Sequence, residues 1–261
     1  MRYDKTRFAS SCHLHFSDRK TVFITFDDRP ADSSYIERVW RCASERAGRF
    51  HSLAACQWEM VVSRVAGQTS LTVRGPETQA SAADCPNDGE WLAIRFRLGT
   101  FMPNLRPGTL RDRNDVTLPA ASSHSFWLAG SVWEYPDFEN AEAFVARLVR
   151  RGIVAVDPCV HDTLQGHRPK LTSRTAQRRF LQATGVTHAT IQQVERARRA
   201  TNLLRQGTPL LEAALATGYY DQAHFTRALR RFIGQTPAAI QRGEEQLSFL
   251  YNTQIAEFAK V

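Results

Sequence analysis

The chain has 261 residues, of which 43% are apolar and 23% are charged, and its formal net charge is +8. This composition is typical of globular proteins and excludes a wholly disordered chain, and no apolar run reaches the roughly 18 residues of a membrane-spanning helix. Five cysteines without C-x-x-C spacing, and a polar start without a secretory signal, favour a cytoplasmic protein with reduced thiols.

The first elements are predicted to be a strand and a helix. Residues 22–26 form a β-rich run that ends at the turn-forming residues 27–30. The Asp-Ser-Ser segment at 32–34 is expected to cap a helix, because apolar residues follow it at a spacing of four. This helix should continue to about Ala47 and stop at Gly48.

Further strands are expected between residues 59 and 98. Two β-branched runs, 59–65 and 70–74, are separated by Gly67 and predict a hairpin. Residues 91–98 alternate between apolar and other side chains, which predicts a half-buried strand with Arg95 on the face opposite the apolar one. Several short strands of this kind favour a small barrel or sandwich.

A small barrel could enclose a small-molecule effector. Five aromatic side chains are candidates to line such a pocket, although an ordinary core is the simpler interpretation of each one taken singly. They are Trp58, Trp91, Phe96, Phe126 and Trp127.

The pattern changes near residue 137. Asp137 or Asn140 is expected to cap a helix that runs to about Arg151 and ends at Gly152, and almost everything from Asp157 onward is predicted to be helical. The sequence therefore predicts an α+β chain with two domains. Its parts are a β-rich effector-sensing or dimerisation domain at 1–136, a connecting helix and linker at 137–156, an all-α DNA-binding domain at 157–243 and a tail helix at 244–261.

The positive charge is concentrated in the helical part. Residues 157–243 carry 13 Lys and Arg against 5 Asp and Glu, a net charge of +8. Removing these from the totals of 34 basic and 26 acidic residues leaves 21 of each, so the rest of the chain is neutral. A basic domain beside a neutral one suggests a polyanionic partner.

The basic part contains an internal repeat. Residues 174–187 match residues 223–236 at an offset of 49, with Arg, apolar, Gly and Thr positions in register. Each copy predicts a helix–turn–helix unit, and a long helix at about 188–205 joins them. Two recognition helices on one rod can enter successive major grooves about 34 Å apart. The repeat therefore predicts a domain that binds double-stranded DNA.

The two copies resemble a known family. Leu171-Thr-Ser-Arg-Thr-Ala-Gln-Arg-Arg-Phe180 with Gly185-x-Thr187 is similar to the first recognition unit of AraC/XylS-family transcription regulators. Gly218-Tyr-Tyr-Asp-Gln-Ala-His-Phe-Thr-Arg227 with Gly234-Gln-Thr-Pro237 is similar to the second. The resemblance implies a transcription regulator, most often an activator that works with RNA polymerase. It also implies an N-terminal domain, cupin-like in some members, that senses a small molecule or forms a homodimer.

Carried over by position, the resemblance assigns DNA contacts to both recognition helices. Arginine can bind guanine through two hydrogen bonds, and glutamine suits adenine. The arginine pairs 198–199 and 230–231 suit phosphate, although a solvated helix face is the simpler interpretation of a lone arginine pair. The expected contacts are Ser173, Arg174, Gln177 and Arg178 from the first helix, and Gln222, Ala223, His224, Thr226 and Arg227 from the second.

Enzymatic and metal-binding alternatives have weaker support. Pro158-Cys159-Val160-His161 resembles the acceptor motif of DNA alkylation-repair proteins, but no acceptor domain surrounds Cys159. His13 and His15 have ligand spacing, and His51, Cys56 or His124 could complete a metal set, yet nothing in the sequence brings them together. We therefore expect no enzyme, no metal and no cofactor.

Overall fold

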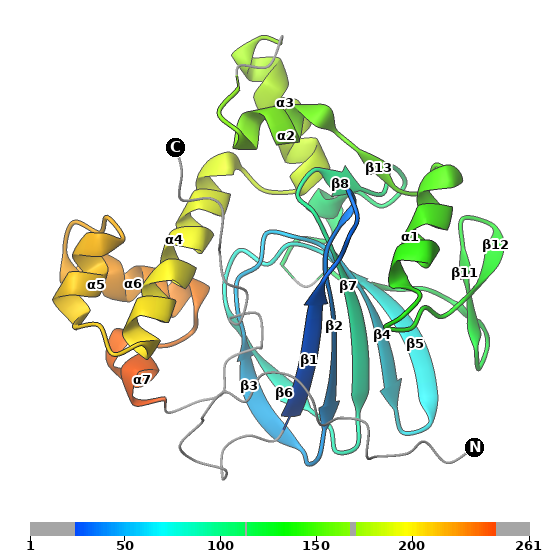
Figure 1. The fold of residues 1–261 in the computed structure, drawn as a ribbon, viewed down its shortest axis with the longest axis horizontal. Coiled ribbons are helices and arrows are strands. Elements are labelled where there is room, and N and C mark those ends of the chain that lie inside the picture. The colour runs from blue at the N-terminus through cyan, green and yellow to red at the C-terminus, as the bar shows by residue number, and fades with distance from the viewer. Residues whose placement is uncertain (1–23, 113, 168–170, 244–261) are drawn as a thin grey trace.

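The computed structural model describes residues 24–112, 114–167 and 171–243 (Figure 1). Antiparallel sheets make up the N-terminal part and helices the C-terminal part, as predicted. The strands are β1 (Ile24–Pro30), β2 (Ile36–Ser44), β3 (Gly48–Ser52), β4 (Glu59–Val65), β5 (Gln68–Arg74), β6 (Ser81–Cys85), β7 (Glu90–Phe96), β8 (Thr100–Phe101), β9 (Val116–Thr117), β10 (Ala120–Ser122), β11 (Ser125–Leu128), β12 (Ser131–Glu134) and β13 (Ala155–Val156). The helices are η2 (Pro107–Thr109), α1 (Ala141–Arg150), α2 (Pro158–Leu164), α3 (Ser173–Thr184), α4 (His188–Arg205), α5 (Leu210–Ala216), α6 (Gln222–Phe232) and α7 (Pro237–Arg242).

The main sheet is open at both edges. Its six strands follow the order β1-β2-β7-β4-β5-β9, so β1 and β9 are its edge strands. The strands β3 and β6 form a separate pair, and β10, β11 and β12 form a third antiparallel sheet. Among the described residues these strands form no closed barrel, and the expected cupin-like barrel is not observed.

The predicted hairpin is confirmed. Strands β4 and β5 pair along their whole length, from Glu59 opposite Arg74 to Val65 opposite Gln68. Ala66 and Gly67 both have positive φ, at 50° and 77°. Two left-handed residues in a two-residue loop match the right-handed twist of the flanking strands, which explains why the chain reverses here.

The helix predicted after residue 34 is wrong, since this segment is strand β2. The Ser33 hydroxyl accepts hydrogen bonds from the backbone N–H groups of Tyr35 and Ile36, so it shapes the turn before a strand instead of capping a helix. Strand β2 pairs with β1 on one side and β7 on the other. Strand β1 also extends to Pro30, beyond its predicted end, which an edge strand tolerates.

The strand at β7 is confirmed, but the predicted exposure of its second face is wrong. Arg95 is only 2% exposed. Its charge is compensated inside the sheet, since its Nε donates a 2.6 Å hydrogen bond to the Glu59 carboxylate on β4. The Trp40 indole N–H donates to the same carboxylate oxygen at 3.3 Å. Burial disfavours the charged form of Glu59, but these two groups and the charge of Arg74 hold its pKa below the ordinary value.

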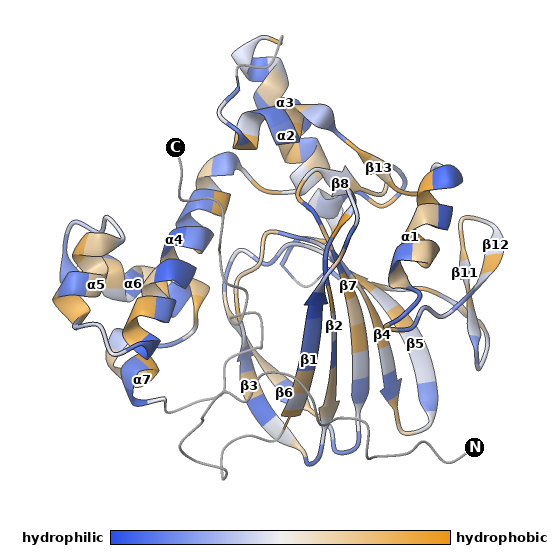
Figure 2. Cartoon of the chain, in the orientation of Figure 1, coloured by the Kyte–Doolittle hydropathy of each residue, from blue (hydrophilic) through white to orange (hydrophobic). Residues whose placement is uncertain are grey.

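Most of the aromatic side chains proposed as pocket lining fill the core instead. The rings of Trp58 and Phe96 stack with centroids 3.8 Å apart, and Phe126 lies in the same buried cluster. Trp91 packs beside Ile24 and Cys85 in a smaller cluster. Figure 2 shows hydrophobic residues along the central strands and on α1 beside the sheet. Trp127 differs from the others, since it is 46% exposed.

The helical part follows the predicted boundaries closely. The side chains of Thr172, Thr187 and Asp221 cap α3, α4 and α6 by accepting hydrogen bonds from backbone N–H groups. Left-handed glycines, Gly185 after α3 and Gly218 after α5, end the preceding helical segments. The predicted tail helix at 244–261 lies outside the described residues.

The two parts of the chain share a hydrophobic core. Leu53 and Ala54, which follow β3, and the nearby Cys56 belong to the same buried cluster as the cores of α3, α4 and α6. The backbone N–H of Ala54 donates to the carbonyl of Phe232 at 2.9 Å, and that of Ala80 donates to Arg231 at 2.7 Å. Figure 1 shows α4 to α7 along one side of the sheet and α2 and α3 at one end of it.

Candidate nucleic-acid interface

Helix α6 presents a polar face because its apolar stripe is buried. Phe225, Leu229 and Phe232 are at most 4% exposed and lie in the helical core. All five residues predicted to contact DNA from this helix lie outside that stripe. Gln222, Ala223 and Arg227 are exposed, and His224 and Thr226 are partly exposed.

The beginning of α6 is held by several contacts. The Asp221 carboxylate accepts a 2.6 Å hydrogen bond from the His224 backbone N–H. The Tyr219 ring, 3% exposed, packs against the rings of His224 and Phe225 at 5.1 and 5.0 Å. The burial of Tyr219 raises the pKa of its hydroxyl. These contacts position the first turn of the helix, which is the part a recognition helix presents to base edges.

Helix α3 shows the same division into a buried and an exposed face. Ala176, Phe180 and Ala183 are buried, as expected for the residues that face the core. The four residues predicted to contact DNA from this helix are all exposed: Ser173, Arg174, Gln177 and Arg178.

Arg179 turns away from this face. Its guanidinium group forms two hydrogen bonds with the Asp157 carboxylate, at 2.9 and 3.0 Å, and this carboxylate raises the pKa of Arg179. Asp157 also caps α2 by accepting a hydrogen bond from the Cys159 backbone N–H. One carboxylate therefore joins the two helices of the first unit.

Arginines on the two exposed faces are available for an external anion. No carboxylate of the described residues forms an ion pair with Arg174, Arg178 or Arg227. Arg178 and Arg227 occupy equivalent positions of the repeat, each on the exposed face of its helix. Helix α4 connects the two units and buries the predicted stripe. Its 18 residues span about 27 Å at 1.5 Å per residue.

The sequence left two interpretations of Arg198 open, a phosphate contact or a solvated helix face, and the structure fits neither. This side chain is buried, and its Nη2 donates a 2.8 Å hydrogen bond to the Ala54 carbonyl, across the contact between the two parts of the chain. Its Nη1 lies 3.7 Å from the Glu195 carboxylate. Arg199 is exposed, as are Arg230 and Arg231. The arginine that the sequence suggested for DNA therefore stabilises the docking of the β-rich part.

One residue that supports the second helix–turn–helix unit was not predicted from the sequence. The Arg196 guanidinium lies over the Tyr219 ring, 4.4 Å from its centroid, and donates to the Gly218 carbonyl at 3.5 Å. It therefore supports the turn before α6 from α4. An arginine 23 residues before a turn tyrosine gives no local signal of this contact.

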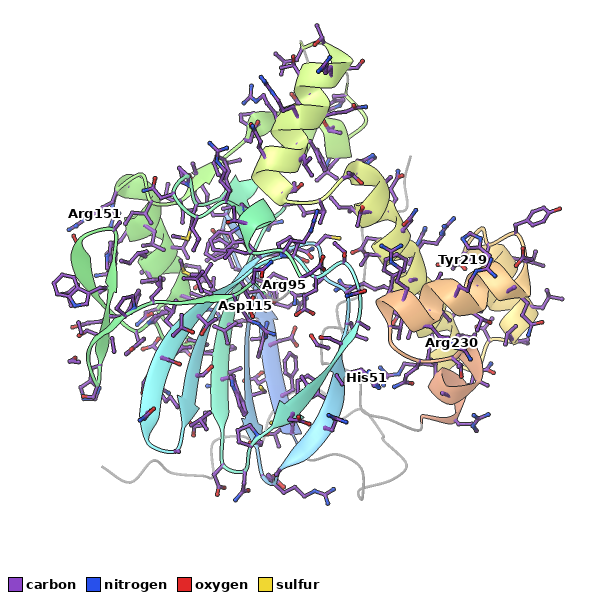
Figure 3. All side chains as sticks on the ribbon, turned by 180° about the vertical axis from the view of Figure 1, so that it is seen from behind. His51, Arg95, Asp115, Arg151, Tyr219 and Arg230 are labelled. Carbon is purple, nitrogen blue, oxygen red and sulfur yellow. The ribbon has the colours of Figure 1, made fainter. Side chains whose placement is uncertain are left out.

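The structure places Cys159 and the residues considered as metal ligands in different parts of the chain. The Cys159 thiol is buried between α2 and α3, 3.9 Å from the Ala176 carbonyl. Burial raises the pKa of the Cys56 thiol to about 12, within the helical core. His51 instead lies beside Gly234 (Figure 3), and His124 lies in the β10–β11 turn. No cluster of three potential ligands occurs in the part of the chain that the structure describes, and His13 and His15 lie outside it.

Two helix–turn–helix units on one connecting helix, each with an exposed polar face, define a DNA-binding protein of the helix–turn–helix class. A family model described as a helix-turn-helix domain matches residues 167–243, which supports an AraC-like DNA-binding domain in this part of the chain. No match was found among curated proteins or among solved structures. None of the described helices is long and apolar enough to cross a membrane.

Proposed function

We propose that this protein is a sequence-specific transcription regulator whose helices α3 and α6 enter successive major grooves of one DNA duplex. The observation that carries the proposal is the equivalent exposure of Arg178 and Arg227 in two repeated units. The helix-turn-helix match over residues 167–243 supports DNA binding independently. The protein acts by binding alone, without catalysis, in the cytoplasm.

The chemistry of the two faces suits direct reading of bases. Arg178 and Arg227 can each form two hydrogen bonds with a guanine, and Gln177 and Gln222 can do so with adenine. The Ala223 side chain can contact a thymine methyl group. Arg199 of α4 and Arg230 of α6 are exposed and suit phosphate contacts, which position the protein on the duplex.

Regulation is assigned to the β-rich part. We propose that it responds to a small-molecule effector or joins two subunits, and that the bound protein activates transcription through contact with RNA polymerase. The shared core around Leu53 and Ala54 supports this assignment, because it gives the β-rich part direct contact with α4 and α6.

Selection of random duplex DNA by the purified full-length protein tests the proposal. Sequencing of the bound pool is expected to show two short elements about 10 base pairs apart, one for each recognition helix. A single element would mean that only one unit reads bases. No enrichment over the input pool, with and without crude metabolite extract as a source of effector, would overturn the proposal.

Alanine at either repeated arginine should weaken specific binding. Arg178→Ala and Arg227→Ala are each expected to cost about 1–3 kcal/mol on the selected site and to relax base preference at one or two positions. Fluorescence anisotropy with matched and mutated duplexes measures both effects. Arg49→Ala is a suitable control, because Arg49 is an exposed arginine of β3 that pairs with Asp84. Unchanged affinity in both variants would show that α3 and α6 do not face the bases.

A further inference from the structure

A surface cavity of about 740 Å³ lies between the β11–β12 hairpin and α1. Cavities that hold small molecules are typically about 300–1,000 Å³. The hairpin contributes Trp127, Val132, Trp133 and Glu134, and α1 with the residue after it contributes Arg147, Arg150 and Arg151. Figure 3 shows Arg151 at the end of α1 beside this hairpin, on the side of the sheet away from α6.

The hairpin contributes two exposed hydrophobic side chains to the cavity. Trp127 is 46% exposed and Val132 is 52% exposed, although both are large hydrophobic side chains. No ring among the described residues stacks on Trp127. Trp133 is buried beneath this surface, 6% exposed, against the Phe144 ring of α1. The Trp127 indole is therefore accessible at the surface, while Trp133 is packed against α1.

The part of the cavity next to α1 is strongly basic. Arg147 and Arg151 lie over the Trp133 ring, 5.6 and 5.3 Å from its centroid, and Arg151 also donates to the Ser131 hydroxyl. Arg150 is exposed. Within the described ranges no carboxylate pairs with any of these three arginines. Since Glu134 is the one acidic residue of the lining, the cavity keeps a net charge of +2.

The geometry points to a small aromatic carboxylate as the ligand of this cavity, and we propose that it binds there. A planar ring can stack on the exposed Trp127 indole and contact Val132. The carboxylate can accept hydrogen bonds from the guanidinium groups of Arg147, Arg150 and Arg151, which pair with no carboxylate of the described residues. The apolar side of the main sheet cannot take this role, because stacked side chains such as Trp58 and Phe96 fill it.

The cavity is also placed to influence the DNA-binding helices. Six residues follow Arg151 before Pro158 begins α2, and among them β13 pairs with β8. Asp157, the last of these residues, caps α2 and holds Arg179 of α3. A ligand bound to α1 therefore lies one short connection away from the first recognition helix. This regulatory consequence rests on the proposed function, whereas ligand binding itself does not.

Binding is tested on the full-length protein with benzoate, 2-naphthoate and indole-3-acetate, each beside its primary amide. Isothermal titration calorimetry is expected to show saturable 1:1 binding of at least one carboxylate and at least tenfold weaker binding of its amide. Arg150→Ala should weaken the bound carboxylate at least tenfold, because the removed group supplies a charge-assisted hydrogen bond. Trp127→Ala should weaken it about fivefold through loss of stacking.

Both variants are expected to fold, because Arg150 and Trp127 are exposed, and circular dichroism checks this. Arg150→Glu gives a second variant of the same position, and Arg49→Ala is the control that should retain wild-type affinity. Three results would each overturn the proposal: no carboxylate binds, the amide binds equally well, or the Arg150 and Trp127 variants bind like the wild type. DNA affinity measured without ligand is independent of these results, so a failed ligand site and a failed DNA-binding function are distinguishable.

Discussion

Replacing Arg95 with alanine is expected to lower the free energy of unfolding by about 3–5 kcal/mol, the usual cost of breaking a buried ion pair. The variant leaves the Glu59 carboxylate inside the sheet without its main partner, since Arg95 contributes both a 2.6 Å hydrogen bond and the nearest positive charge. The bond from Trp40 and the charge of Arg74 remain, and they compensate only in part.

The pH dependence of this loss has a defined sign. In the wild type the pKa of Glu59 is lowered, so the stabilisation by the pair is present above the unfolded-state pKa of about 4.3 and is lost as pH falls through the folded-state pKa. Without Arg95, burial should instead raise the pKa of Glu59, and the folded state would then bind the additional proton. The stability deficit of Arg95→Ala is therefore expected to shrink as the pH is lowered from 7 to 5.

Urea unfolding of wild type and variant at several pH values measures both effects. The double variant Arg95→Ala/Glu59→Gln provides the matched control, because a neutral amide removes the unpaired charge at nearly constant volume. We expect it to be more stable than Arg95→Ala at pH 7 and to show a deficit that does not change with pH. A loss below 1 kcal/mol in Arg95→Ala would mean that the carboxylate is not enclosed as the structure indicates.

Leu53→Ala is expected to destabilise the chain by about 2–5 kcal/mol, as for other fully buried leucines. The variant also tests which region of the chain loses stability. Leu53 belongs to the β-rich part by sequence, but it packs in the core of α3, α4 and α6 at 0% exposure. Its truncation should therefore lower the stability of the helical part as well.

Two optical probes separate the two regions. All five tryptophans lie between residues 40 and 133, so tryptophan fluorescence reports on the β-rich part, whereas circular dichroism at 222 nm reports mainly on the helices. In Leu53→Ala both unfolding midpoints should move to lower denaturant. Val39→Ala, which truncates a side chain buried within the sheet core, should mainly move the fluorescence midpoint. If Leu53→Ala moved the fluorescence midpoint alone, Leu53 would not contribute to the stability of the helical part.

Local signals were sufficient to predict the helical part. The cap hydrogen bonds join residues two or three positions apart, as from Cys159 to Asp157 and from His224 to Asp221, so a short stretch of sequence contains the whole interaction. The left-handed glycines act over a similar range. The exposure of the predicted DNA-contacting residues followed from the same helix boundaries and the 3.6-residue period.

The errors arose where a distant partner decides the outcome. Residues 36–44 contain helix-like spacing, but pairing with β1 and β7 makes them a strand. Arg95 resembles a surface residue of an alternating strand until Glu59, 36 positions earlier, is placed beside it. Arg198 resembles half of a phosphate-binding pair, and its actual acceptor is a carbonyl 144 residues away. None of these partners could be identified from a local window.

Helix α4 has a consequence for the DNA sites of such a regulator. It runs for 18 residues without a glycine or a proline, and Arg198 attaches it to the β-rich part. A stiff connector of this kind fixes the distance between the two recognition helices. One extra base pair between two half-sites would turn the second by about 36° and displace it by about 3.4 Å, beyond what a rigid helix can follow. The target promoters are therefore expected to diverge over evolution in the bases that are read, while the gap between the two elements stays constant, and a genome search should hold that gap unchanged.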